Sequence, residues 1–188
     1  MPFECLSLDI PGLVLIKPRI FADDRGYFLE LYKLSEYAKA GIKEHFVQDN
    51  YSKSAFRALR GLHYQMNPKA QGKLISCLNG RIYDVAVDIR RGSPHYGKWV
   101  SVELSGEGKE LLYVPPGFAH GFQVMSESAE VIYKCTEEYS PEDDRGIIWN
   151  DADIRIVWPL PDPLLSKKDQ QHPRLKNAEH DFVFTPHP

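Results

Sequence analysis

Long apolar runs are missing from the 188-residue sequence, and the longest are Gly12–Ile16 and Leu111–Val114. A transmembrane helix needs about 20 consecutive apolar residues, so we expect no membrane-spanning segment and no membrane partner. The first four residues, Met-Pro-Phe-Glu, also lack the charged and then apolar layout of a secretory signal peptide. We therefore expect a soluble protein of the cytoplasm.

Cysteine is scarce, with only Cys5, Cys77 and Cys135, which are odd in number and far apart. This pattern excludes both a disulfide framework and a cysteine-rich zinc cluster. An excess of basic residues is missing as well, because 23 Lys and Arg are set against 26 Asp and Glu, for a net charge of −3. Proteins that bind nucleic acid usually carry a basic surface, so we expect no nucleic-acid partner.

Familiar nucleophile and phosphate-binding motifs are also missing. The sequence contains no Gly-x-Ser-x-Gly elbow and no Cys-x-x-Cys pair. Ser105–Lys109 begins like a glycine-rich phosphate loop, but no strand–helix–strand pattern surrounds it. These motifs therefore do not explain what the chain does.

What is present is the composition of an ordinary globular protein, with 43% hydrophobic and 26% charged residues. The length predicts a single domain that comprises residues 1–188. After Pro159 the chain becomes rich in proline and charge. We expect this part, about 159–188, to be a tail that wraps over the domain.

Short apolar and β-branched runs, separated by Gly, Pro, Asn and Asp, predict many β-strands. The predicted strands are Leu13–Pro18, Tyr27–Tyr32, Phe46–Tyr51, Lys73–Leu78, Arg81–Ile89, Trp99–Leu104, Leu111–Val114, Gly121–Met125, Glu130–Thr136 and Ile154–Trp158. One helix is predicted at Ser35–Ala40, with Ser35 as N-cap and Gly41 just past its end. Such a series, with few and short helices, predicts an all-β fold, an antiparallel sandwich or barrel.

Asn79-Gly80 lies between two of these strands and predicts a two-residue hairpin turn. This register would place Lys73 opposite Ala86 and would bring Lys73 and Asp84 to one face of the hairpin. Charged groups on an apolar face are costly to bury without partners. The face therefore either contains a structural ion pair or lines a pocket in which the charges act on a ligand.

Two segments resemble the signature motifs of the cupin superfamily, whose fold is an antiparallel jelly-roll barrel. They are Arg60–Gln65 with the following Gln71-Gly-Lys73 and Gly80, and Val114–Gly121. His63 and His120 stand at metal-ligand positions of that pattern, but Gln65 replaces the second histidine and Lys73 replaces the glutamate. An ammonium group cannot ligate a cation and repels it, so we expect no bound metal.

The resemblance narrows further to the dTDP-4-dehydrorhamnose 3,5-epimerase (RmlC) family. The matching blocks occur in family order over roughly residues 10–175. They are Phe21–Glu30, Phe46–Asn50, Arg60–Gln65, Gly117–Phe122, Tyr133–Thr136, Gly146–Asp151 and Ser166–Asp169. The resemblance implies an enzyme without cofactor that converts dTDP-4-keto-6-deoxy-D-glucose to dTDP-4-keto-L-rhamnose, and it implies a homodimer.

The implied reaction removes protons next to a keto group, so it needs a base, a cation for the enolate oxygen and an acid on the opposite face. By family match His63 is the base and Asp169 orients its imidazole. Lys73 would stabilise the enolate, and Tyr133 would return the proton. Asp84 is our candidate to position Lys73, from the hairpin register.

Further family matches imply contacts with the substrate. The positions are Arg25, Arg60 and Lys168 for the pyrophosphate, Glu30, Gln48, Asn50 and His120 for the sugar or nucleotide, and Tyr139 for stacking on thymine. Asp144 stands where the family pattern has glutamate. Because aspartate is one methylene shorter, its contact would be lost or would run through water.

Several alternatives stay open at this point. The same scaffold could carry an epimerase that acts at one carbon, a sugar-nucleotide ketoisomerase, or a binding module without catalysis. A metal-dependent cupin oxygenase is a further alternative, against which Lys73 argues. The presence of both His63 and Tyr133 favours an epimerase over the ketoisomerase.

Overall fold

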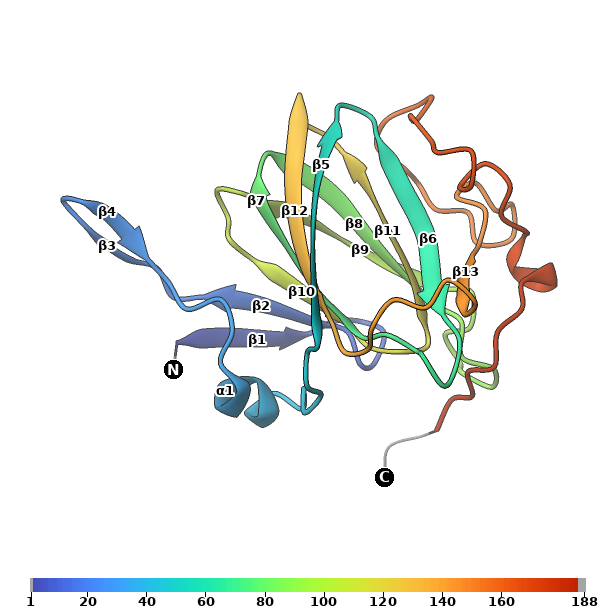
Figure 1. Ribbon diagram of the computed structural model, residues 1–188, viewed down its shortest axis with the longest axis horizontal. Coiled ribbons are helices and arrows are strands. Elements are labelled where there is room, and N and C mark those ends of the chain that lie inside the picture. Colours follow the sequence, from blue (N-terminus) through green and yellow to red (C-terminus); the bar gives the residue numbers. More distant parts are fainter. Residues whose placement is uncertain (1, 186–188) are drawn as a thin grey trace.

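The computed structural model describes residues 2–185 and consists mainly of two antiparallel β-sheets that face each other (Figure 1). In spatial order the first sheet contains β1 (Phe3–Ser7), β2 (Val14–Pro18), β10 (Leu111–Val114), β7 (Lys73–Asn79), β12 (Ser128–Cys135) and β5 (Gln48–Ala55). The second contains β13 (Asp144–Gly146), β6 (Leu59–Gln65), β11 (Phe118–Val124), β8 (Arg81–Asp88) and β9 (Trp99–Ser105). The prediction of an antiparallel all-β barrel is confirmed.

The core lies between the two sheets, where alternate residues of each strand point inward. Ile75 and Cys77 of β7 pack there with Ile82 of β8 and Phe122 of β11. Each of these side chains is at most 4% exposed. Burial of an apolar side chain of this size contributes about 1.5–3 kcal/mol, so this layer holds the two sheets together.

Each sheet is also covered on its outer face. Leu175 and Phe182, from the C-terminal segment, pack with Leu62 and Val87 on the outer face of the second sheet. This segment runs beside β6 and β13 in Figure 1. On the outer face of the first sheet, Tyr37 and Ile42 belong to a third apolar cluster that includes residues of β2, β7 and β10.

The predicted β7–β8 hairpin is wrong. Although Gly80 joins the two strands directly, β7 pairs with β10 and β12, whereas β8 pairs with β11 and β9 in the other sheet. Gly80 has a φ of +77°, and a Cβ there would lie 2.1 Å from the carbonyl oxygen of Ser128. The turn therefore carries the chain from one sheet to the other, and inward residues of both strands meet across the barrel.

The single α-helix, α1 (Leu34–Lys39), begins one residue earlier than predicted. Its N-cap is Lys33 and makes no side-chain capping bond, so the assignment of Ser35 as N-cap is wrong. The predicted stop is confirmed, because Gly41 follows the helix with a φ of +88°. That left-handed conformation suits glycine at a helix C-terminus.

Two predicted strands differ from the structure. Ile154–Trp158 forms no strand, because Arg155 has a φ of +57° and the preceding turn is bonded to the carboxylate of Asp151. Only the start of Tyr27–Tyr32 is extended, in a small hairpin of β3 (Phe21–Asp23) and β4 (Gly26–Phe28). This hairpin projects away from the two sheets in Figure 1, and we call it the β3–β4 arm.

Among residues 2–185, no helix is long and apolar enough to cross a membrane.

Candidate active site

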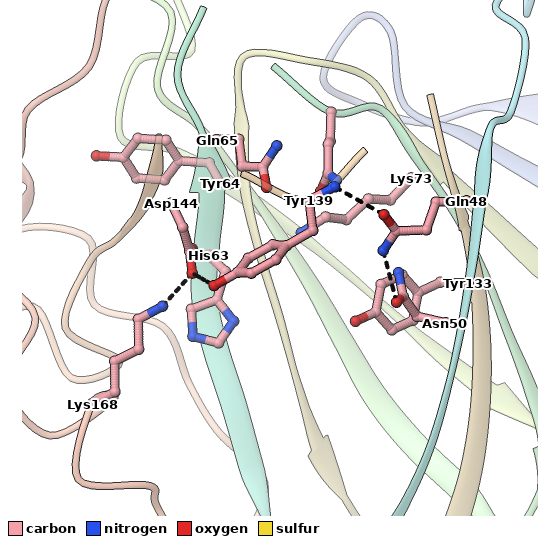
Figure 2. A pocket seen from close by; sticks show the side chains of 11 residues that line it. Gln48, Asn50, His63, Tyr64, Gln65, Lys73, Tyr133, Tyr139, Asp144 and Lys168 are labelled. Atoms are coloured by element: carbon pink, nitrogen blue, oxygen red, sulfur yellow. Dashed lines mark hydrogen bonds and ion pairs between the residues drawn. The ribbon is translucent and has the colours of Figure 1, made fainter. Parts of the chain in front are cut away.

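Two adjoining cavities of about 250 and 220 Å³ lie where the two sheets meet. Both are lined by His63, Lys73, Tyr133 and Lys168, so they form two parts of one cleft. His63 comes from β6 of the second sheet, whereas Lys73 and Tyr133 come from β7 and β12 of the first. Figure 2 shows these side chains converging from both sides of the larger cavity.

His63 is paired with Asp169, which follows the sheets by some 20 residues in the chain. Nε2 of His63 lies 2.6 Å from Oδ1 of Asp169, and the hydroxyl of Ser166 donates to Oδ2 at 2.8 Å. Burial alone would raise the pKa of Asp169, but neighbouring His172 and the bonds from His63 and Ser166 hold that pKa well below its usual range. Asp169 is therefore an ionised acceptor, and Nε2–H of His63 is the donor.

The other ring nitrogen of His63, Nδ1, is left to accept a proton. Burial lowers the pKa of His63, while the hydrogen bond and charge of Asp169 act in the opposite direction and the positive charge of Lys73 lowers it further. The net direction is down, so the imidazole is neutral at neutral pH. A neutral imidazole oriented by a carboxylate is suited to act as a general base.

Lys73 brings a positive charge into the cleft beside this base. Burial lowers its pKa, and the nearby Cys135, Asp144 and Asp84 act against that shift. Cys135 is its direct neighbour across the β7–β12 pair. An ammonium group in a poorly solvated site interacts strongly with any negative charge that develops next to it.

Tyr133 lies on β12, in the sheet opposite His63. Its pKa is raised, first by burial and then by the charges of Cys135 and Asp144, against a smaller opposing effect of Arg60. The phenol therefore keeps its proton over the whole neutral range. The cleft thus contains a base and a proton donor on different walls.

Asp84 does not take the place that the sequence suggested. Its carboxylate accepts from Nε2 of His120 at 2.8 and 3.0 Å, and both side chains are buried. No hydrogen bond joins Asp84 to Lys73 among the described residues, so Asp84 acts on Lys73 only through its charge. His120 lines the smaller cavity together with Lys73, and Asp84 holds its imidazole from within the protein.

The rim of the larger cavity is a connected polar network. The backbone amide of Tyr139 donates to Gln48 at 2.8 Å, and Gln48 in turn donates to Asn50 at 2.9 Å. The phenol of Tyr139 donates to Asp144 at 2.9 Å, and Lys168 forms an ion pair with the same carboxylate (Figure 2). Tyr139 remains 55% exposed, so one face of its ring is open to a ligand.

Arg60 lines the smaller cavity, where its Nε donates to the hydroxyl of Ser54 at 2.9 Å. Arg25 and Glu30, by contrast, are not brought to the cleft of this chain. Arg25 is on the β3–β4 arm, exposed and bonded to Asp23 at 2.6 Å. Glu30 follows the arm and lies 3.9 Å from Lys33.

Sequence reasoning gave no site role to several residues that line or adjoin the cleft, among them Ser52, Ser166 and His172. Ser166 and Ser52 line the smaller cavity, and His172 approaches Asp169 to 3.6 Å. The spacing Ser166-x-x-Asp169 is a signal that could have identified Ser166, because residues three apart in a turn can bond to each other. His172 carried no such signal, since only the fold brings it beside His63.

The positions at which cupins hold a metal do not fit one here. Gln65 uses its side-chain amide to donate to the carbonyl of Lys69 and to accept from the amide of Ser140, so it is tied to the backbone. Lys73 is a cation at the carboxylate position. A different set of donors, from His63, Asp169 and His172, lies within 4.8 Å of one another.

Two facing antiparallel sheets that enclose such a cleft define a jelly-roll protein of the cupin class. The family model described as dTDP-4-dehydrorhamnose 3,5-epimerase matches residues 7–177. A Pseudomonas aeruginosa protein of that name is 51% identical over 94% of this chain and 98% of its own length. The chain therefore belongs to the dTDP-4-dehydrorhamnose 3,5-epimerase family, and it is an isomerase.

Solved structures agree with this assignment. The epimerase RmlC of Legionella pneumophila, crystallised with dTDP-4-keto-L-rhamnose, has a TM-score of 0.90 and 46% identity, and the match covers 93% of this chain and 94% of that one. A 3'-monoepimerase of Streptomyces bikiniensis, crystallised with dTDP-quinovose, has a TM-score of 0.85 and 32% identity, over 90% and 87% of the two chains.

Proposed function

We propose that this chain inverts carbons 3 and 5 of dTDP-4-keto-6-deoxy-D-glucose and releases dTDP-4-keto-L-rhamnose. The observation that carries the proposal is the placement of His63 and Tyr133 on opposite sheets, with Lys73 on the strand next to that of Tyr133 and all three lining one cleft. Inversion of a carbon requires that the proton leave from one face and return to the other. Family membership supports the same reaction.

In the proposed reaction, Nδ1 of His63 takes the proton from a carbon next to the 4-keto group. The electron pair of that C–H bond moves into the ring and charge develops on the keto oxygen, where the ammonium of Lys73 stabilises it. Tyr133 then donates its phenolic proton to the opposite face of the carbon. Asp169 holds the imidazole and stabilises its charged form, and no redox or metal cofactor is needed.

The polar rim is suited to the dTDP part of the substrate. The exposed ring of Tyr139 offers a stacking surface for thymine, and Gln48 and Asn50 offer amide groups beside it. Lys168 and Arg60 supply positive charge for the pyrophosphate. Asp144 forms an ion pair with Lys168 in the free protein, so it orients the side chain of that lysine.

We infer further that the protein acts as a homodimer. The β3–β4 arm exposes Phe21, Tyr27 and Phe28, which are 46%, 57% and 66% exposed. Exposed aromatic residues on a projecting hairpin are typical of a surface that a partner covers. Arg25 lies on this arm, so in a dimer its guanidinium would reach the cleft of the second copy.

Inversion at carbon 3 alone is the second candidate, and the likeness to a 3'-monoepimerase supports it. The lower identity to that protein, 32% against 46% for the Legionella epimerase, favours double inversion. Whether one or both carbons are inverted depends on the distances from Tyr133 to carbon 3 and to carbon 5 of the bound substrate.

The deciding experiment is incubation with dTDP-4-keto-6-deoxy-D-glucose in D₂O, followed by NMR and mass spectrometry. We expect deuterium at carbons 3 and 5 and a rhamnose-configured product. Deuterium and inversion at one carbon would establish the second candidate instead. Absence of exchange at both carbons would contradict catalysis and leave a binding protein.

The variants His63→Ala and Lys73→Ala test the two central groups in the same assay. A general base contributes about 10²–10⁴-fold, and an electrostatic contact with the developing charge about 10²–10³-fold. We expect turnover to fall by at least these factors while dTDP binding, measured by calorimetry, persists. Wild-type turnover in either variant would remove that residue from the mechanism.

A further inference from the structure

His172 lies beneath the His63–Asp169 pair and takes no part in the reaction proposed above. Its side chain is only 8% exposed, and its Nε2 is 3.6 Å from Oδ1 of Asp169. That nitrogen is buried and has no hydrogen-bond partner within residues 2–185. A buried polar atom without a partner is costly, so its retention calls for an explanation.

The fold holds the His172 ring firmly in this place. A Cβ on Gly146 of β13 would lie 2.4–2.6 Å from three atoms of the ring, so the ring rests directly on the glycine backbone. The ring also packs edge-on against His63, with the ring centroids 5.5 Å apart at an interplanar angle of 74°. Strand β13 in turn pairs with β6, and Gly146 is the register partner of His63 in that pair.

Three donor atoms therefore converge, one from each of His63, Asp169 and His172, all within 4.8 Å of one another. Two imidazoles and a carboxylate are a donor set that suits Zn²⁺ and neighbouring transition-metal ions. Zinc lies about 2.0–2.2 Å from such ligands, which places ligand atoms of a tetrahedral site about 3.3 Å apart. The present 2.6 and 3.6 Å separations bracket that value, and the two imidazole donors lie within 4.8 Å of each other, so adjustments of at most about 1.5 Å would seat an ion.

We propose that His63, Asp169 and His172 form a binding site for a transition-metal ion of the Zn²⁺ type, and that its occupancy switches off the base. The inference rests on the proposed function only for its effect on activity. The site shares His63 with the metal position of cupins, but its other two ligands are Asp169 and His172, and it does not use the positions at which Gln65 and Lys73 stand.

Metal binding would inactivate His63 as a base because of where the imidazole proton must go. In the free protein Nε2 of His63 donates to Asp169 and Nδ1 has the free electron pair. When Nε2 binds the metal ion, the proton of the neutral ring moves to Nδ1, and the number of protons on the ring is unchanged. Nδ1 then has no electron pair to accept a proton from the substrate. The smaller cavity beside His63 and Asp169 leaves room for a water as fourth ligand.

Metal binding at the site is measured by titrating the wild-type protein with Co²⁺. The visible absorption of Co²⁺ reports four-coordinate binding, and no substrate is needed. We expect one bound ion per chain and displacement by Zn²⁺. Outer-shell partners of a ligand alone are worth about 10–100-fold in affinity, so His172→Asn, which removes a ligand, should weaken binding by at least that much. His45→Asn, at an exposed histidine far along the chain, is the matched control and should bind as the wild type does.

The effect on the base is measured as deuterium exchange into the substrate with and without Zn²⁺. We expect exchange to stop in the wild type, to return on addition of EDTA, and to resist Zn²⁺ in His172→Asn. If His172→Asn fails to fold by its thermal transition, His172→Leu replaces it. A Co²⁺ spectrum unchanged in the His172 variants, or a bound ion with unchanged exchange, would overturn the proposal. If the protein shows no exchange even without metal, the proposed function fails while the Co²⁺ titration still decides the site.

Discussion

At His63, burial and a neighbouring carboxylate act on the pKa in opposite directions, and burial prevails. The result is a base that is neutral at working pH and is still stabilised when it becomes charged. The two residues are 106 positions apart in the sequence, yet their atoms lie 2.6 Å apart. Lys73 adds a positive charge nearby, which further favours the neutral ring before reaction.

The pH dependence of turnover follows from this balance. Because the base must be neutral, kcat/KM falls as the pH drops below the pKa of His63. That pKa is lowered, so the acidic limb should lie below the usual histidine value of about 6.5. In Asp169→Asn the charge that raises this pKa is removed, so the limb should move to still lower pH while the plateau falls by about 100-fold or more.

The measurement is a pH–rate profile of deuterium exchange for both proteins. Ser166→Ala, which removes a bond to Asp169 but leaves its charge, is the matched control and should shift the limb little. An acidic limb at the same pH in Asp169→Asn and wild type would show that Asp169 does not tune His63.

At the scale of elements, β6 decides where the base stands, although the sequence analysis did not predict this strand. Its residues, Leu59–Gln65, include Gly61, Arg60 and His63, and so lack a continuous apolar or alternating pattern. Gly61 has a φ of +136°, and Gly121 of β11 faces it across the strand pair. The close approach of these two glycines sets the position of His63 relative to His120, its register partner.

Substitution of Gly61 by alanine tests this packing. A Cβ at Gly61 would lie 2.6 Å from Cα of Gly121 and 2.9 Å from the carbonyl oxygen of His120. Backbone strain and overpacking together should cost about 2–5 kcal/mol of unfolding free energy, and turnover should fall because β6 must shift. Denaturant unfolding and the exchange assay measure the two effects.

Gly92→Ala is the matched control, since Gly92 also has a positive φ, of +81°, but no atom lies within 4 Å of the point that a Cβ there would occupy. It should cost only the backbone strain of about 1–2 kcal/mol and leave turnover intact. Equal stability losses in the two variants would contradict a special role of the β6–β11 contact.

At the scale of the whole molecule, the aromatic side chains of the β3–β4 arm stay largely exposed in the single chain, although Lys109 lies over the ring of Tyr27. The arm projects from the two sheets (Figure 1) and carries Arg25, which the family resemblance assigns to the substrate. A cleft that lacks Arg25 in its own chain would be completed by the arm of a second copy.

This arrangement predicts complementation between inactive variants. Arg25→Ala and His63→Ala should each show little turnover, but a mixed dimer would have one cleft with an intact base and an intact arm. Random mixing after unfolding and refolding should restore about a quarter of wild-type activity, because half the dimers are mixed and each has one working site. Light scattering gives the mass of each sample, and mixtures as inactive as their components would contradict a shared site.

The sequence by itself determined the all-β class, the family, and most of the strands between Lys73 and Cys135. These follow from short apolar runs and from ordered motif blocks, which are local features of the chain. The three residues to which the family resemblance gives catalytic roles, His63, Lys73 and Tyr133, all line both cavities. This assignment came from the family resemblance, whose motif blocks are each carried on one strand or turn.

Only the tertiary structure decided how these strands meet. The local signal of Asn79-Gly80 predicted a hairpin, but β7 and β8 find better partners in opposite sheets, where their apolar faces form the core from two sides. The same long-range packing pairs Asp84 with His120 and brings the ring of His172 against that of His63, and the β3–β4 arm projects away from the two sheets (Figure 1). Such contacts depend on burial shared between distant segments, which no single stretch of sequence records.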